Sequence, residues 1–337
     1  MPGTTGATIR GHTMRRIALI NQKGGVGKTT TAVNLGAALA EAGRRVVLVD
    51  LDPQGNLSLH LGRELKPDEP SSYGLLTGAH GFADAILATE TERLSLIGTT
   101  IDLSGAELEL ATALGRESLL RDAMQEWVRD HQAAHGEEPA DYVLFDCPPS
   151  LGLLSINALT AANEIFLAVQ TEFFALQGMS KLLELVGLVQ KRLHRDLRVT
   201  GIVPCLYDSR LRLAREVLVE LRRHFPEQIF STAIGTNVKL AESPSFGQTI
   251  LQYAPESNGA RDYRALAAEV LAQEDELAPT EASPEPVVEV QAAAPEASAP
   301  PPAPAQEARS VTSDASASPA PPTSSGYSGM SEVDELL

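Results

Sequence analysis

Cysteine, aromatic residues and long hydrophobic runs are scarce in this 337-residue sequence. Its two cysteines, Cys147 and Cys205, are far apart and form no CxxC motif, which argues against zinc or iron–sulfur ligation and favours a reducing cytoplasm. Aromatic residues make up 4% of the chain, so an interior of leucine, valine and alanine is favoured over an aromatic-rich β-sandwich. No apolar run reaches the ~18 residues that a membrane-spanning helix needs.

Basic residues are also in the minority, with 27 Lys and Arg against 44 Asp and Glu, which excludes a wholly basic protein that coats nucleic acid. Residues 274–337 hold 12 of the acidic residues, one arginine and 11 of the 22 prolines. This composition, with no apolar period, predicts an acidic, Pro/Ala-rich disordered tail, and the spacing of Ser331 and Asp334 allows a short helix at its end. Residues 1–13 lack the apolar stretch of a signal peptide and are expected to form a flexible N-terminal extension.

The body of the chain alternates short apolar runs with longer amphipathic stretches. Four- and five-residue runs without polar interruption are typical of strands buried on both faces of a parallel sheet. The pattern predicts an α/β fold, a doubly wound and mostly parallel sheet, in one domain over residues 14–273. The expected strands are 17–20, 46–49, 142–145, 165–169 and 199–203, and the expected helices are 28–42, 115–130, 177–194, 208–225 and 258–271.

The most informative motif is Lys23-Gly-Gly-Val-Gly-Lys-Thr29, which follows the first expected strand and opens a helix. Glycines allow backbone amides to turn toward phosphate oxygens, Lys28 supplies a positive charge, and Thr29 can bind Mg²⁺. The usual phosphate loop has glycine in place of Gln22 and nothing like Lys23. A glycine-rich turn can also serve geometry alone, but the strand–loop–helix context predicts a P-loop NTPase-like nucleotide site. Its expected binding residues are Lys23, Gly24, Gly25, Val26, Gly27, Lys28, Thr29 and Thr30.

Acidic residues follow two further strands. Asp50 and Asp52 come after the second strand, and Asp146 after the third. Ligands of open α/β sheets lie beyond the carboxyl ends of the strands, so these side chains are expected near the phosphates. An aspartate at the end of an apolar strand often helps to hold Mg²⁺, which makes Thr29 and Asp146 the candidate metal residues. A turn or cap role remains an alternative for Asp52 and Asp146.

These motifs resemble the ParA/Soj family of partitioning ATPases, in the deviant Walker A class that includes MinD. The resemblance covers about residues 15–272 and includes four further segments: 47–56, 146–154, 170–178 and 237–247. It implies ATP and Mg²⁺ as cofactors and assigns catalytic roles. Lys23 would reach across a dimer to the partner's nucleotide, Lys28 would hold the β- and γ-phosphates, and Asp52 would orient the attacking water. It also places Asn237 at the nucleotide.

The family resemblance further implies an ATP-dependent dimerisation switch with weak ATPase activity. Such a switch would bind DNA non-specifically, respond to a ParB-like activating protein, and partition a chromosome or plasmid. It would be cytoplasmic and nucleoid-associated, with no membrane partner.

A basic stripe on the expected helix 208–225 provides a candidate DNA face. Its arginines fall within about 100° of the helix surface, opposite Val217, Leu218, Leu221 and Phe225. The family comparison adds two more cations, which gives the candidate set Arg210, Arg212, Arg215, Arg222, Arg223 and Lys239. A solvated, ion-paired face is the alternative. Where the family usually reads Ile-Pro-Arg-Asn-Val-Arg, this chain has Ile234-Gly-Thr-Asn-Val-Lys239, so Thr236 replaces one cation.

The sequence also bears on four alternative functions. MinD-like membrane positioning is disfavoured because the C-terminal residues 331–337 carry acids and no Lys or Arg. Iron–sulfur chemistry is disfavoured by the unpaired cysteines. Positioning of some other intracellular cargo by the same switch remains open, as does ligase or kinase chemistry, which would leave Lys23 without a role.

Overall fold

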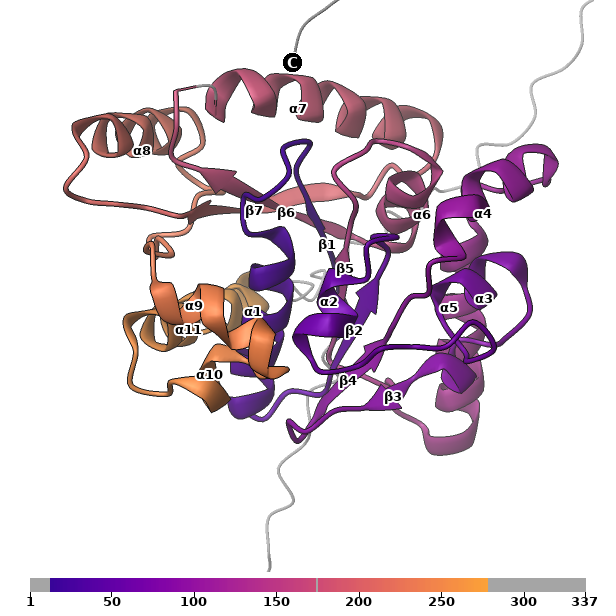
Figure 1. The fold of residues 1–337 in the computed structure, drawn as a ribbon. Coiled ribbons are helices and arrows are strands. Elements are labelled where there is room, and N and C mark those ends of the chain that lie inside the picture. Colours follow the sequence, from indigo (N-terminus) through magenta and orange to yellow (C-terminus); the bar gives the residue numbers. More distant parts are fainter. Residues whose placement is uncertain (1–12, 174, 278–337) are drawn as a thin grey trace, which may run out of the picture. The chain divides into compact units, whose positions relative to one another are not determined.

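The computed structural model describes residues 13–173 and 175–277, and a single sheet runs through this part of the chain (Figure 1). Its seven strands lie in the order β3-β4-β2-β5-β1-β6-β7, and every neighbouring pair is parallel except β3 with β4. The predicted doubly wound, mostly parallel α/β fold is therefore confirmed. The strands are β1 (Arg15–Ile20), β2 (Val46–Asp50), β3 (Leu87–Ala88), β4 (Leu94–Ile97), β5 (Tyr142–Asp146), β6 (Glu164–Gln170) and β7 (Arg198–Cys205).

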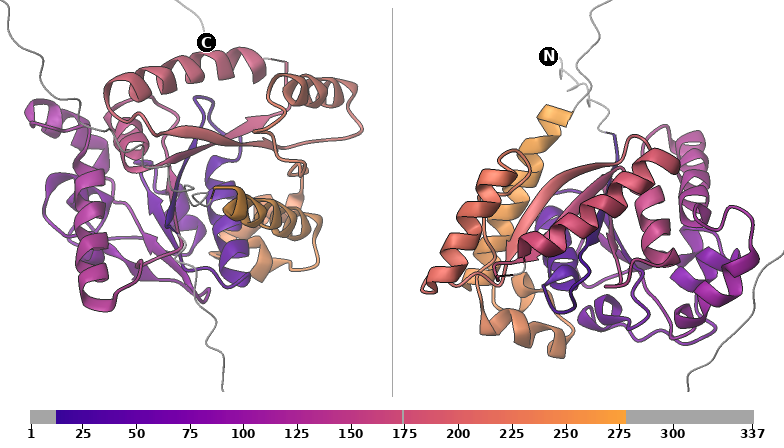
Figure 2. Two further views of the ribbon diagram at one scale, coloured as in Figure 1. Left: turned by 180° about the vertical axis from the view of Figure 1, so that it is seen from behind. Right: turned by 90° about the horizontal axis from the view of Figure 1, so that it is seen from above.

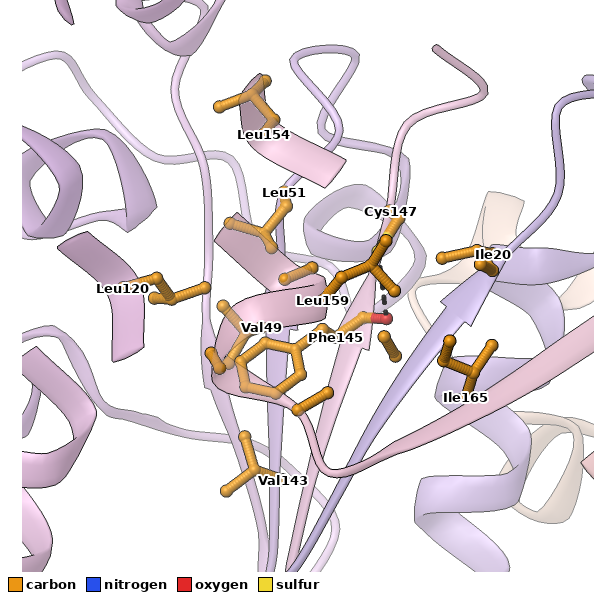
Figure 3. Packing of buried hydrophobic residues seen from close by; sticks show 14 of the residues in the cluster. Ile20, Val49, Leu51, Leu120, Val143, Phe145, Cys147, Leu154, Leu159 and Ile165 are labelled. Atoms are coloured by element: carbon orange, nitrogen blue, oxygen red, sulfur yellow. Dashed lines mark hydrogen bonds between the residues drawn. The ribbon is translucent and has the colours of Figure 1, made fainter. Parts of the chain in front are cut away.

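Helices cover both faces of the sheet (Figure 2). On one face, α1 (Lys28–Glu41) and α11 (Asn258–Leu277) pack against alternate strand residues such as Ile17 and Leu48. On the other, α5 (Leu119–His135), α6 (Leu153–Ala161) and α7 (Ala175–Arg192) cover the residues between them, including Val143 and Phe145 (Figure 3). Burial on both faces explains why these strands read as uninterrupted apolar runs.

The remaining helices lie around the edges of these layers. They are α2 (Asn56–His60), α3 (Ser72–Thr77), α4 (Leu103–Glu109), α8 (Arg212–His224), α9 (Val238–Glu242) and α10 (Ile250–Tyr253), with short 3₁₀ turns η1 (Ala83–Ala85), η2 (Leu110–Thr112) and η3 (Ser243–Phe246). Within the described ranges, none of these helices combines the length and apolar character needed to cross a bilayer.

Two helices begin later than the sequence pattern predicts. α5 starts at Leu119 rather than at residue 115, because Gly115 has φ +67° and a turn is closed by the Ser118 amide on the Gly115 carbonyl (2.8 Å). α8 starts at Arg212 rather than near Asp208, whose side chain accepts a hydrogen bond from the Arg210 amide at 3.0 Å. An aspartate that binds a nearby backbone amide favours a turn over a helix.

The last helix continues beyond its expected end. The sequence pattern predicts an end at residue 271, whereas α11 extends to Leu277. Polar side chains hold the added turn, since Arg44 donates to Glu274 (Nε to Oε1, 3.2 Å) and Arg15 donates to Gln273 (Nη2 to Oε1, 3.1 Å). Apolar periodicity alone does not reveal such long-range polar contacts. Most of the predicted extension (1–13) and tail (274–337) lies outside the described residues.

Candidate functional site

The loop between β1 and α1 has the backbone conformation that its glycines suggest. Gly25 and Gly27 have φ of +72° and +95°, a region that residues with a side chain rarely adopt. Gly27 is the N-cap of α1, and no side chain caps this helix end. The amide groups of the first turn have no acceptor within the helix itself, so they are available to an anion.

One pocket of about 940 Å³ brings most of the predicted nucleotide residues together. Its lining includes Gly24, Gly25, Gly27, Lys28, Thr29, Thr30, Asp52 and Asn237. Val26 is not among the lining residues, because its side chain is buried in the core beneath the loop. Lys23 also lies outside this pocket. A cavity of this size, open at the carboxyl ends of the strands, can hold a nucleotide.

Asp50 and Asp146 are neighbours on adjacent strands, since they are register partners in the β2–β5 pair. Asp50 is fully buried and accepts hydrogen bonds from Ser58, from the amide at 3.0 Å and from the hydroxyl at 2.7 Å. Its other oxygen accepts from the Asp52 amide at 3.2 Å. Burial raises the pKa of Asp50 to about 6, against these hydrogen bonds. Through these hydrogen bonds, Asp50 holds the start of the loop that carries Asp52 close to α2.

Asp146 is fully buried, and neither of its carboxylate oxygens has a hydrogen-bond partner in the described part of the chain. Burial raises its pKa to about 8, the charge of Asp50 adds to this, and Thr29 and Lys28 act in the opposite direction. A buried carboxylate without partners, close to a threonine hydroxyl, supplies the hard oxygen ligands that Mg²⁺ prefers. These residues therefore fit a Mg²⁺ site.

Asp52 stands at the pocket wall in a tight turn. Its Oδ1 accepts a hydrogen bond from the Gln54 amide at 3.0 Å, and its carbonyl accepts from the Gly55 amide at 2.8 Å. The side chain is held toward the cavity while α2 begins directly afterwards at Asn56. The turn role considered from the sequence and a role at the pocket therefore coexist in this residue.

Lys23 points to its own chain rather than into the pocket. Its ammonium group forms an ion pair with Glu172 and donates to Gln170 Oε1 at 3.1 Å. The side chains of Lys23 and Glu172 are 57% and 50% exposed, so the pair is open to solvent.

The predicted basic residues are exposed, and several are ion-paired. Arg212 binds Glu216 at 2.7 Å, Arg210 binds Asp208 at 2.7 Å, and Lys239 binds Glu242 at 2.8 Å. Arg223 lies 3.9 Å from Glu220, while Arg215 and Arg222 donate to backbone carbonyls. Leu218 and Leu221 are buried on the opposite side of α8, as the helical projection predicts. Exposed pairs of this kind contribute about 0–1 kcal/mol, so a phosphate can displace them at little cost.

Several polar pocket residues were not anticipated from the sequence. Among them, Asn56 and His60 line the pocket from α2, and Cys205 and Tyr263 line it from β7 and α11. The spacing of Asn56 and His60, four residues apart, is the one local signal that could have placed them on a common helix face. Cys205 and Tyr263 are brought in only by the packing of distant elements.

Known proteins are similar to this chain in sequence. The family model described as an AAA domain matches residues 14–199. The sporulation initiation inhibitor protein Soj of Bacillus subtilis is 46% identical over 256 residues, 76% of this chain and 98% of that protein. The chromosome-partitioning ATPase Soj of Thermus thermophilus is 46% identical over 265 residues, 78% of this chain and 98% of that protein.

A solved structure has the same fold with a nucleotide bound. The cobyrinic acid a,c-diamide synthase of Mycobacterium smegmatis, with bound ADP and magnesium, is 36% identical. The alignment covers 78% of this chain and 96% of that one, with a TM-score of 0.65.

Proposed function

This chain belongs to the ParA/Soj family of partitioning ATPases, and we propose that it works as an ATP-dependent dimerisation switch on DNA. It is an ATPase that uses ATP and Mg²⁺. In the proposed cycle the ATP-bound dimer binds DNA without sequence preference, a ParB-like protein activates a weak hydrolysis, and the monomers leave. The cargo of this cycle is a chromosome or plasmid, and the switch acts at the nucleoid.

The position of Lys23 carries this proposal. The residue belongs to the phosphate loop, yet its side chain lies outside the loop's own pocket and is exposed. Within its own chain, the positive charge of Lys23 is balanced by Glu172 in an exposed ion pair. Exposed pairs contribute little free energy, so Lys23 can exchange this carboxylate for the phosphates of a nucleotide bound by a second subunit.

Within each subunit, the pocket residues divide the work of phosphoryl transfer to water. Loop amides and Lys28 hold the phosphates. Thr29 and Asp146 would hold Mg²⁺, which neutralises developing phosphate charge when it is bound. Asp52, fixed by the Gln54 amide, orients the attacking water. These are mainly positioning and electrostatic contributions, which suits a slow, regulated hydrolysis.

The basic face of α8, together with Arg210 and Lys239, supports the DNA part of the proposal. The exposed arginines of this face can act on a DNA phosphate at short range. The acidic residues elsewhere on the chain are screened beyond about 8–10 Å at physiological salt. A dimer presents this face twice and so makes more phosphate contacts than a monomer. Nucleotide state then controls DNA affinity. With Thr236 in place of a cation, we expect retention to be weaker and more salt-sensitive than in relatives that keep the arginine.

The test is a filter-binding assay with random-sequence duplex DNA at low salt, in the presence of ATP or ADP. The proposal predicts retention with ATP only, and weaker retention for Arg210→Ala and Lys239→Ala. Arg121→Ala, an arginine of α5 paired with its neighbour Asp122, is the matched control and should bind like the wild type. If the ATP-bound dimer ignores DNA even at low salt, partitioning on DNA is wrong and positioning on another matrix replaces it.

A further inference from the structure

His60 is a buried polar residue that the proposed phosphate chemistry does not use. It is 2% exposed, and its Nε2 has no hydrogen-bond partner within the described residues. It nevertheless lines the same pocket as Asp52. Burial without a partner costs free energy, so a buried polar nitrogen on a pocket wall calls for an explanation.

His60 lies on the helix that follows the Asp52 loop. It is one helical turn from Asn56, and both residues line the pocket, so one side of α2 continues the wall that Asp52 begins. Asp50 fixes α2 to the end of β2 through two hydrogen bonds to Ser58. A displacement of α2 therefore displaces Asp52 as well.

The C-terminal end of α2 leads into Gly62, whose backbone lies against the backbone of Gly247 in the segment after η3. The His60 ring lies near the backbone of Gln248, which acts to raise the pKa of the imidazole against the effect of burial. Gly62 and Gly247 both have positive φ, +67° and +65°, and a Cβ on Gly247 would lie 2.9 Å from the Gly62 Cα. No other residue fits this contact without moving one segment. Figure 1 shows α2 in front of the sheet, facing the α9–α10 region.

The segment reached by this contact also carries a candidate DNA residue. η3 follows α9 directly, and Lys239 of α9 is tied to Glu242 (2.8 Å), which also accepts from the Tyr253 hydroxyl (2.8 Å). Phe246 stacks on Tyr253 with ring centroids 4.9 Å apart. These contacts join α9, η3 and α10 into one unit.

We propose that the contact of His60 and Gly62 with Gly247 and Gln248 couples the Asp52 loop to the α9–η3 unit, with His60 as its positioning residue. In this proposal, nucleotide and its hydration water in the cavity supply the hydrogen-bond partner that the buried Nε2 lacks. Nucleotide in the pocket then holds α2 and the α9–η3 unit in one fixed arrangement. In the other direction, DNA bound at Lys239 shifts this unit and so changes how Asp52 orients water. The DNA end of this coupling rests on the proposed function. The nucleotide end does not.

Two further observations support this role. Burial lowers the pKa of His60 to about 4, so the ring is neutral at pH 7 and can hold one hydrogen bond on each nitrogen without a buried charge. Asp50, which is joined to α2 through Ser58, is engaged by Ser58 and Asp52 rather than by the imidazole. Nε2 belongs to a residue of the pocket wall and has no partner among the described residues.

Hydrogen exchange tests the nucleotide end without DNA. Binding of Mg²⁺ and a non-hydrolysable ATP analogue should protect the amides of residues 245–248, none of which lines the pocket. His60→Leu should lose this protection even when it is saturated with the analogue. His60→Gln, which can keep both hydrogen bonds, should retain it. His80→Leu, a histidine packed on Gly74 outside the pocket, is the matched control and should behave like the wild type.

ATPase rates with and without random duplex DNA test the other end. The wild type should change its kcat on adding DNA, and the ratio of the two rates should fall to about one in His60→Leu and Gly247→Ala and return in His60→Gln. A purely structural role would lower both rates together and leave the ratio unchanged. Wild-type protection and a wild-type ratio in a folded His60→Leu or Gly247→Ala variant would overturn the coupling. If the wild type binds no DNA, the proposed function fails, and the exchange result still decides the nucleotide end.

Discussion

Lys23 and Glu172 form an ion pair within one chain, and Gln170 accepts a further hydrogen bond from the same ammonium group. In the proposed dimer this ammonium group instead meets a phosphate of the other subunit. The intramolecular pair must break first, so it opposes dimerisation. Because both partners are about half exposed, the opposition is small, and ATP binding can overcome it.

We predict that Glu172→Gln lowers the ATP concentration needed for half-maximal dimerisation, by up to about fivefold for a solvent-exposed pair. Light scattering over an ATP titration measures this directly. Glu184→Gln, an exposed glutamate on α7, is the control and should leave the midpoint unchanged. A midpoint that shifts to higher ATP in Glu172→Gln would mean that this carboxylate supports the dimer instead.

Loss of the Lys23 side chain should prevent dimerisation while leaving ATP binding largely intact. Lys23→Gln should keep ATP affinity within a few-fold, because its side chain lies outside its own pocket, but should remain monomeric at saturating ATP. Equilibrium binding of a fluorescent ATP analogue, run beside light scattering, distinguishes the two effects. Loss of ATP binding in parallel with dimerisation would place Lys23 in its own subunit's site.

Lys28 is nearly buried and lines the pocket, so loss of its side chain should weaken the binding of ATP. We expect Lys28→Ala to weaken ATP binding by about 10- to 100-fold, since a hydrogen bond to a charged group is worth roughly 1.5–3 kcal/mol. Titration calorimetry with Mg²⁺ and ATP checks this. Lys181→Ala, an exposed lysine of α7, should bind as the wild type does, and equal affinities for all three proteins would refute the assignment.

The carboxyl of Asp146 should destabilise the protein in the absence of nucleotide and metal. Its pKa is raised to about 8, so the folded state keeps a proton that the unfolded chain, with a normal pKa near 4, releases. The free energy of unfolding therefore falls as pH rises from about 4 to 8, and Asp146→Asn should escape this loss. We expect its melting temperature to exceed that of the wild type by at least about 2–4 °C at pH 8, and by less at pH 5.

Thermal unfolding of the metal-free protein at several pH values provides this measurement. Asp130→Asn, an exposed aspartate of α5, should show no such pH-dependent gain. Adding Mg²⁺ and ATP should reverse the order, because Asp146→Asn loses a metal ligand. An Asp146→Asn protein that is less stable than the wild type at pH 8 without ligand would show that the carboxylate has a partner when ionised.

The buried strands and the phosphate loop could be predicted because their signals are local. An uninterrupted apolar run such as Tyr142–Phe145 fits a strand covered on both faces, and Gly25 and Gly27 occupy backbone conformations that only glycine adopts easily. β4 was missed because it has four residues with a serine inside it, and β3 because it has two. Such short segments become strands only through pairing with the existing sheet.

The part of the candidate site that is built from short sequence motifs could be predicted from the sequence. Lys28, Thr29 and Asp52 line the pocket as the motifs indicate. The places of His60 and Tyr263 in the pocket wall could not be predicted, because tertiary packing brings α11 to the pocket and the segment after η3 against the end of α2. The position of Lys23 beside Glu172 was likewise hidden, since the two residues come from the ends of different strands.

The salt dependence of DNA binding should report how many cations contact phosphates. Each neutralised phosphate adds about 0.9 to the slope of log affinity against log salt, so Arg210→Ala should reduce the slope by roughly two in a dimer that presents this residue twice. Filter binding between about 50 and 200 mM salt covers the range in which such slopes are measurable. An unchanged slope would remove Arg210 from the DNA face.

The switch itself is tested most directly by the mass of Asp52→Ala in solution with saturating ATP and Mg²⁺. The side chain lies at the pocket wall, where its removal spares the phosphate-binding loop but takes away the group that we propose orients water. Light scattering coupled to gel filtration should show a stable dimer that retains unhydrolysed ATP, and a monomer without nucleotide. The Asp130→Ala control should dimerise only transiently, as the wild type does. An Asp52→Ala protein that stays monomeric at saturating ATP would contradict the account.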